Sequence, residues 1–334
     1  MIEAQNPTRQ IDLDFADYII ERERNFAARS INGVPDYSFS LDEQLRRKIA
    51  LVRPVRDLAH AMTSIWTPDV RQQYLRIGVA VGPRQYPEIH ALGEACARRL
   101  GIGVPQMFIT HSPEPGGFTI ATDDREPVIV LTSALVGALS TEELLFVIGH
   151  ECGHIHNLHG VYNVAAEMIA NPLMITLLQQ VAKAGTALKL IRTIEHLHLL
   201  AGVVQGGLRL FFMHWSRCAE ITCDRAGLIC CGDLQTAQMA LIRLIIGDAA
   251  RLQGFDIDAY IDQLNQNSSP ARFAELFATH PLIPRRVEAL RWFAQCETFY
   301  GWHPELRSSD GALSKSEVDQ RCERIVNVFA GAGE

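Results

Sequence analysis

Two histidines and a glutamate with the spacing of a metal site lie in one short stretch, His150-Glu151-Cys152-Gly153-His154. Residues four apart on an α-helix project from the same face, so His150 and His154 can direct two imidazole nitrogens at one metal ion. Glu151 would then take a proton from a water that the metal acidifies and pass it to a leaving amine. Such a pattern arises by chance in about 2–3% of chains of this composition, so its surroundings must support it.

A catalytic zinc ion usually has three protein ligands, so a third must be found. Glu220 and Asp224 are also four apart in a predicted helix, so one carboxylate can bind the metal while the other hydrogen-bonds a ligand histidine. If the motif helix continues, His156 lies about 120° and His159 about 180° around the helix from His150. We therefore expect neither to bind the ion, and we expect His159 to be a helix-end histidine that interacts with the helix dipole.

The motif lies in the best-defined helix that the sequence predicts. Ser140 and Glu143 have the spacing of a capping box, apolar residues follow at helical spacing, and Gly160 is expected to end the helix. Before it, short β-branched or aromatic runs predict strands at 105–110, 117–121 and 127–131. The fold class is therefore α+β, predominantly helical, with a small, mainly antiparallel sheet next to the HExxH helix.

Further helices follow from apolar residues at helical spacing and from capping signals. They are predicted at 41–66 with a kink at Pro54, and at 87–100, 216–231, 234–246, 284–292 and 316–330.

The composition is that of a folded globular protein, with 48% hydrophobic and 21% charged residues among 334. A net charge of −7 gives no basic surface for nucleic acid. The N-terminus does not resemble a secretory signal, and the eight cysteines are scattered, so we expect reduced thiols and a cytoplasmic location. We expect no transmembrane segment, while peripheral membrane contact and the oligomeric state stay open.

Taken together, the motifs resemble the HtpX-like zinc metallopeptidases, which include the type 1 CAAX prenyl proteases and belong to the gluzincins. The resemblance covers about residues 85–292 in the order of the family's motifs. It rests on the HExxH helix, His159, Arg217, Glu220, Asp224, Thr279-His280-Pro281 and Arg286.

This resemblance implies a role for each matching residue. Glu220 would be the third ligand of one Zn²⁺, and Asp224 would orient His150. His280 would lie near the substrate and stabilise the oxyanion of the tetrahedral intermediate.

Three residues are candidates for the substrate side of the site. Gly117 and Phe118 stand where many members of the family have an Asn-Ala-Phe-Ala edge strand, and an edge strand can hold an extended peptide through its main chain. Arg286 is the third candidate.

The sequence thus predicts a zinc-dependent endopeptidase in which His150, His154 and Glu220 bind the metal and Glu151 is the general base. Its substrate would be a peptide or a protein. An alternative is a zinc-containing peptide-binding or scaffold protein without turnover, although such a protein would have no use for Glu151. Hydrolysis of a non-peptide substrate at the same metal is a third hypothesis.

Three regions follow from these assignments. Residues 1–80 form an N-terminal helical region, 81–300 the zinc metallopeptidase domain and 301–334 a C-terminal helical tail. Within the domain, residues 160–214 are an apolar insert that would form a lid or a substrate cleft. Polar residues interrupt this insert, so it lacks the eighteen or so uninterrupted apolar residues that a membrane span requires.

Overall fold

The computed structural model describes most of the chain, and the elements of the fold are those of the described residues. These are residues 18–20, 30–31, 34–51, 70–122, 125–160, 162, 203–247, 252, 254–263, 278, 280–307 and 311–327.

The sheet that borders the motif helix has four strands, in the order β3-β4-β6-β5. They are β3 (Gly78–Val81), β4 (Gln106–Thr110), β5 (Gly117–Thr122) and β6 (Arg125–Thr132). The pairs β3–β4 and β5–β6 are antiparallel, whereas the central pair β4–β6 is parallel. The prediction of a mainly antiparallel sheet is therefore wrong, because the sheet is mixed. From β4 the chain passes to the outer strand β5 and then returns through β6, which lies between them. Strand β6 therefore runs in the same direction as β4.

The three predicted strands are present, because each is a short run of β-branched and apolar residues between turn-forming residues. Residues 1–80, expected to be helical, also contain strands. These are β1 (Ser30–Ile31) and β2 (Val34–Pro35), which pair with each other, and β3. Local periodicity did not indicate β3, because its partner β4 lies far along the chain.

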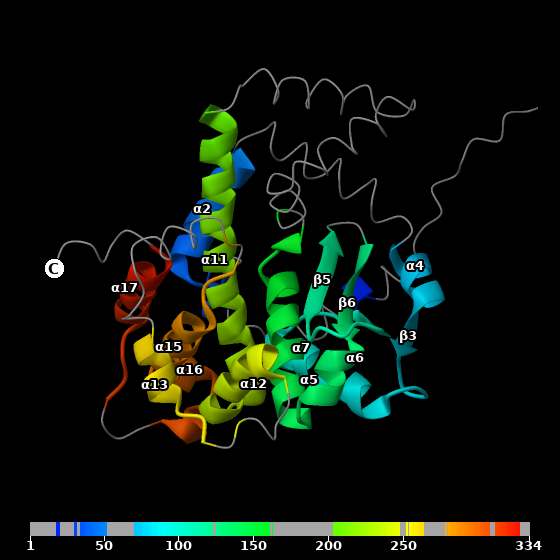
Figure 1. Cartoon of the computed structure of the whole chain (residues 1–334). Helices are drawn as coiled ribbons and strands as arrows, with labels where there is room; N and C mark the ends of the chain where they lie inside the picture. The colour runs from blue at the N-terminus through cyan, green and yellow to red at the C-terminus, as the bar shows by residue number, and fades with distance from the viewer. Residues whose placement is uncertain are drawn as a thin grey trace, which may run out of the picture.

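Helices make up the rest of the fold, and they agree with the α+β prediction (Figure 1). The longer ones are α2 (Ser40–Leu51), α5 (Pro87–Leu100), α7 (Thr141–His156), α11 (Val203–Cys231), α12 (Leu234–Ile246), α15 (Ile283–Phe293) and α17 (Lys315–Val326). The shorter ones are α4 (Val70–Ile77), α6 (Ser133–Ala138), α13 (Ile257–Asp262), α16 (Glu297–Trp302) and the 3₁₀ helix η4 (Pro304–Leu306). The kink predicted at Pro54 lies outside the described residues.

The motif helix α7 begins as the sequence predicts, with reciprocal hydrogen bonds between Ser140 and Glu143 in a capping box. It ends at His156, however, and the prediction that it continues to Gly160 is wrong. Leu158 has a positive φ of 57°, which turns the chain out of the helix. His159 therefore does not occupy the position on the helix surface that its number implied.

Helix α7 packs along α11 on one side and contacts β5 and β6 on the other (Figure 1). Glycines permit the close approach of the two helices. A Cβ atom at Gly149 would lie 2.7 Å from Cys230 Cβ, and one at Gly153 would lie 2.8 Å from Ala226 Cβ. Because Gly149 directly precedes His150 and Gly153 directly precedes His154, the close crossing brings α11 directly against the motif.

The apolar core is continuous from the N-terminal segment to the C-terminal helix. Tyr37, Phe39, Leu45 and Ile49 belong to the same buried cluster as the apolar faces of α7, α11 and α17. All eight cysteines are free thiols. Within the described ranges, no helix has the length and apolar character to cross a membrane. Of the apolar insert at 160–214, residues 203–214 form the start of α11, and most of the remainder lies outside the described residues.

Candidate metal centre

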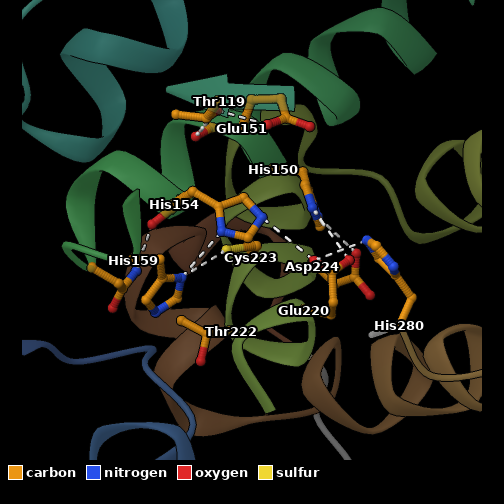
Figure 2. Close-up of polar contacts among 12 residues, drawn as sticks. Thr119, His150, Glu151, His154, His159, Glu220, Thr222, Cys223, Asp224 and His280 are labelled. Atoms are coloured by element: carbon orange, nitrogen blue, oxygen red, sulfur yellow. Dashed lines mark hydrogen bonds and ion pairs between the residues drawn. The ribbon is translucent and has the colours of Figure 1, made fainter. Parts of the chain in front are cut away.

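Side chains from two crossing helices converge at one buried point. His150 and His154 come from α7 and Glu220 comes from α11, and one ligand atom of each lies within 4.8 Å of the others. His150 Nε2 lies 3.6 Å from Glu220 Oε2, and His154 Nε2 lies 3.5 Å from Glu220 Oε1. All three side chains are buried. The spacing of four that placed the two histidines on one face of a helix thus brings them to a common carboxylate (Figure 2).

The carboxylates of this centre are held by a buried arginine. Arg286, from α15, donates from Nε to Asp224 Oδ2 at 2.8 Å and from Nη2 to Asp224 Oδ1 at 2.6 Å. Its Nη1 lies 3.2 Å from Glu220 Oε2. Burial alone would raise the pKa of Glu220, but His280, Arg286 and His150 hold it well below its ordinary value. Glu220 is therefore ionised, as a metal ligand must be.

Asp224 fixes the orientation of His150. Its Oδ1 lies 3.0 Å from His150 Nδ1, which leaves Nε2 facing Glu220. Burial would raise the pKa of Asp224, but Arg286 and the hydrogen bonds from Arg286 and His150 lower it. Burial would lower the pKa of His150, but Glu220 and Asp224 raise it. A carboxylate on the far nitrogen of a histidine is the usual support of a metal-binding imidazole.

His159 folds back against the second histidine of the motif. Its main-chain N–H donates to the His154 carbonyl at 2.9 Å, and its Nδ1 lies 3.2 Å from His154 Nδ1. Its Nε2 lies 3.0 Å from Asp42 Oδ2, and the side chain is fully buried. Burial lowers the pKa of His159 although Asp42 opposes this. The expectation of a helix-end histidine is wrong, because the helix ends before it and the turn at Leu158 directs it inward.

Glu151 lies on the sheet side of α7, next to the outer strand β5. Thr119 Oγ1 donates to Glu151 Oε2 at 2.6 Å and contacts the Glu151 carbonyl at 3.1 Å (Figure 2). A Cβ atom at Gly117 would lie 3.4 Å from Glu151 Oε1. Side chains alternate along a strand, so Phe118 points to the other face, where its ring lies 6.1 Å from that of Tyr74.

His280 is at the solvent-facing edge of the centre. Its Nε2 lies 3.6 Å from Glu220 Oε1, and its side chain is 60% exposed. Arg217, on α11, donates to the carbonyl of Ala278 at 3.0 Å and so anchors the segment that carries His280. A cavity of about 370 Å³ begins here. It is lined by Ile245, Tyr260, Gln263, His280, Pro281, Leu282, Ile283, Pro284 and Arg286.

The residues present suit a divalent metal ion. Two imidazole nitrogens and a carboxylate are a donor set of catalytic zinc sites. Glu220 and Asp224 together carry two negative charges and Arg286 carries one positive charge, so with the imidazoles neutral, as metal ligands are, a cation would offset the remaining negative charge.

Sequence reasoning gave no role to Thr119 or Asp42. Thr119 could not be singled out, because its contact with Glu151 depends on how the sheet packs against α7. Asp42 had a signal. It shares the buried face of α2 with Leu45 and Ile49, and an aspartate in an apolar stripe is expected to have a buried partner.

Comparison with known proteins agrees with this geometry. The model of peptidase family M48 matches residues 83–294. The chain is 25% identical over 275 residues to the plastoglobule-localized metallopeptidase 48 of Arabidopsis thaliana, covering 78% of this chain and 73% of that protein. It is 28% identical over 229 residues to a protease HtpX homolog of Moorella thermoacetica, covering 64% of this chain and 75% of the other.

An HtpX homolog of Pyrococcus abyssi gives the same picture, at 28% identity over 232 residues that cover 64% of this chain and 76% of the relative. The resemblance stated from the motifs is thereby confirmed. The chain belongs to peptidase family M48 and is a metalloprotease of the HtpX-like kind.

Proposed function

We propose that this protein is a zinc-dependent endopeptidase in which His150, His154 and Glu220 hold one Zn²⁺ and Glu151 is the general base. The observation that carries the proposal is the buried convergence of these three ligand groups, with the buried Glu151 next to His150 on the same helix. A zinc ion bound there would polarise the scissile carbonyl and acidify the attacking water.

Glu151 would accept a proton from the attacking water. Its carboxylate accepts a hydrogen bond from Thr119, which leaves oxygen lone pairs available for the attacking water. After attack, the same carboxylate delivers the proton to the leaving amine. His280, at the exposed edge of the centre, would donate a hydrogen bond to the oxyanion that develops on the substrate carbonyl.

The peptide would bind along β5. This strand is the outer member of the described sheet, and an extended chain can pair with its main chain without a particular side-chain sequence. The cavity beyond His280 is lined mainly by apolar residues, and the guanidinium of Arg286 in its wall is occupied by Asp224 and Glu220. We therefore expect this cavity to accept an apolar side chain next to the scissile bond.

The test separates metal binding from chemistry. Purified protein with stoichiometric zinc is incubated with a peptide library, and products are identified by mass spectrometry with and without a chelator. Glu151→Gln should retain zinc and lose cleavage, because the amide cannot take the proton. His150→Ala should lose both zinc and cleavage, because a ligand is gone.

Each result has a definite meaning. Substantial cleavage by Glu151→Gln would contradict the assignment of the general base. Retained peptides without any cleaved product, in wild-type protein loaded with zinc, would favour the scaffold reading instead. Chelator should abolish cleavage in the wild type, and adding zinc back should restore it.

A further inference from the structure

We propose that Asp42 and His159 are positioning residues for His154, forming a buried hydrogen-bonded relay that fixes the orientation and tautomer of this ligand. The proposal rests on the proposed function in one respect, that His154 binds zinc through Nε2. It extends the metal centre to α2, a part of the chain that precedes the family match at residues 83–294.

The direction of the hydrogen bonds follows from the ligand role of His154. Its Nε2 faces Glu220, so Nδ1 carries the proton of the neutral ring. His159 Nδ1, at 3.2 Å, must then accept that hydrogen bond, and the proton of His159 must be on Nε2. That nitrogen faces Asp42 Oδ2 at 3.0 Å, and a carboxylate accepts it. A single assignment of protons satisfies every member.

Asp42 is itself held by α11, the helix that carries Glu220. Its Oδ1 accepts from the indole Nε1 of Trp215 at 3.0 Å, and its Oδ2 accepts from the hydroxyl of Thr222 at 2.6 Å. Only 2% of Asp42 is exposed, so its charge depends on these donors rather than on water. The relay is therefore anchored to the same rigid element as the third metal ligand.

The Nδ1 atom of each proposed histidine ligand is linked to a buried carboxylate. His150 Nδ1 is oriented by Asp224 directly, whereas His154 Nδ1 reaches Asp42 through His159. A carboxylate thus stands behind each imidazole. Support of this kind fixes ring orientation and raises ligand basicity, and its loss typically weakens metal binding by about 10- to 100-fold.

A second metal site is the rival interpretation of the same side chains, because ligand atoms of His154, His159 and Cys223 also lie within 4.8 Å of one another. Two features oppose it. The nitrogen of His154 that faces His159 is Nδ1, while Nε2 faces Glu220, so a second ion would require this one imidazole to bind two metal ions at once. Burial and the neighbouring carboxylates raise the pKa of the Cys223 thiol, which disfavours a thiolate ligand.

The experiment compares zinc affinities, measured by competition with a chelator, in the full-length protein. Asp42→Asn keeps the size of the side chain but can turn an amide N–H toward His159 Nε2. It should weaken zinc binding about 10- to 100-fold. His159→Phe should weaken zinc binding similarly. The double variant should bind zinc no more weakly than the single variant of lower affinity, because both changes interrupt one relay.

Ser38→Ala is the matched control. Ser38 is buried and donates to Asn157, so it joins the same N-terminal segment to the end of α7 outside the relay. Its loss should lower thermal stability and leave zinc affinity unchanged. If Asp42→Asn also lowers stability without changing zinc affinity, the relay is overturned and Asp42 has a structural role alone.

Zinc stoichiometry separates the remaining outcomes. Two zinc ions per wild-type chain, falling to one in Cys223→Ala, would overturn the relay in favour of the second metal site. A wild-type protein that binds no zinc would overturn both the proposed function and the relay. Wild-type protein that binds zinc and cleaves peptides, with Asp42→Asn of equal affinity, would overturn the relay alone.

Discussion

Glu151 receives its hydrogen bond from a residue of the sheet, Thr119, and we predict that this contact sets the turnover rate. Thr119→Val keeps the branched shape of the side chain but removes the hydroxyl that holds Glu151 Oε2. A hydrogen bond to a charged group contributes about 1.5–3 kcal/mol. If it positions the base in the transition state, its loss should lower kcat on the order of 10- to 100-fold. Steady-state kinetics on a cleaved peptide measure this.

Thr119→Ser is the control, because serine retains the hydroxyl and should retain most of the turnover. Zinc content should be the same in all three proteins, since the Thr119 hydroxyl donates to Glu151, which is not one of the proposed metal ligands. An equal fall of kcat in the serine and valine variants would show that the hydroxyl is not responsible.

The residues of the centre divide into those that spacing predicts and those that it does not. Spacing on a helix predicted His150 and His154 and made Glu220 and Asp224 candidates, because a separation of four depends only on local geometry, and the family resemblance implied the roles of the two carboxylates. The contact of His159 with the motif depends on one backbone angle, the positive φ of Leu158, which the sequence pattern did not indicate. No local pattern joins Asp42 to it.

At the level of elements, local signals predicted most segments and failed where the pairing is non-local. The capping box predicted where α7 begins, and short β-branched runs predicted β4, β5 and β6. The sheet is mixed because β5 lies outside β6. This strand order is a property of the topology, and the residue pattern of each strand does not indicate it. β3 forms because β4 offers it a partner.

The crossing of α7 and α11 determines where Glu220 meets the histidines, and we predict that Gly153→Ala disturbs it. A methyl group there would lie 2.8 Å from Ala226 Cβ and 3.1 Å from Cys223 Cα, so the two helices must separate. Such overpacking costs about 1–3 kcal/mol. Urea denaturation should show this loss in metal-free protein, and zinc affinity should fall because Glu220 moves with α11.

Gly207→Ala, on α11 itself, is the matched control. A Cβ atom at this exposed position would meet nothing within 4 Å, so the substitution should stabilise the helix by about 0.5–1 kcal/mol. Zinc affinity should be unchanged. Equal zinc affinity in the Gly153→Ala and wild-type proteins would show that the helix crossing does not set the position of Glu220.

At the scale of the whole molecule, a buried arginine on α11 joins the N-terminal segment to the C-terminal helix. Arg225 donates to the carbonyl of Tyr37 at 3.1 Å and lies 2.8 Å from Asp319 of α17. Its guanidinium lies over the ring of Phe39 and over that of Phe293. The elements on either side of the family match are thus connected to the helix that carries Glu220.

We predict that Asp319→Asn destabilises the protein at neutral pH. Arg225 is fully buried, and removing its carboxylate partner leaves a positive charge without compensation, which costs about 3–5 kcal/mol. Urea denaturation of metal-free protein measures this cost. Asp258→Asn is the control, because Asp258 is 77% exposed in its ion pair with Arg291 and such pairs contribute about 0–1 kcal/mol.

The same substitution gives a pH dependence of defined sign. Burial would raise the pKa of Asp319, but Arg225, Lys315 and the hydrogen bonds from Ser40 and Lys315 hold it below its ordinary value of 3.8. The unfolded chain therefore binds this proton at a higher pH than the folded chain does, so the contribution of Asp319 is complete above 3.8 and is lost as the pH falls through the lower folded pKa. The free energy of unfolding of the wild type should then approach that of Asp319→Asn in acid. A gap between the two proteins that stays constant down to pH values of about 3 would show that the ionised carboxylate is not what stabilises Arg225.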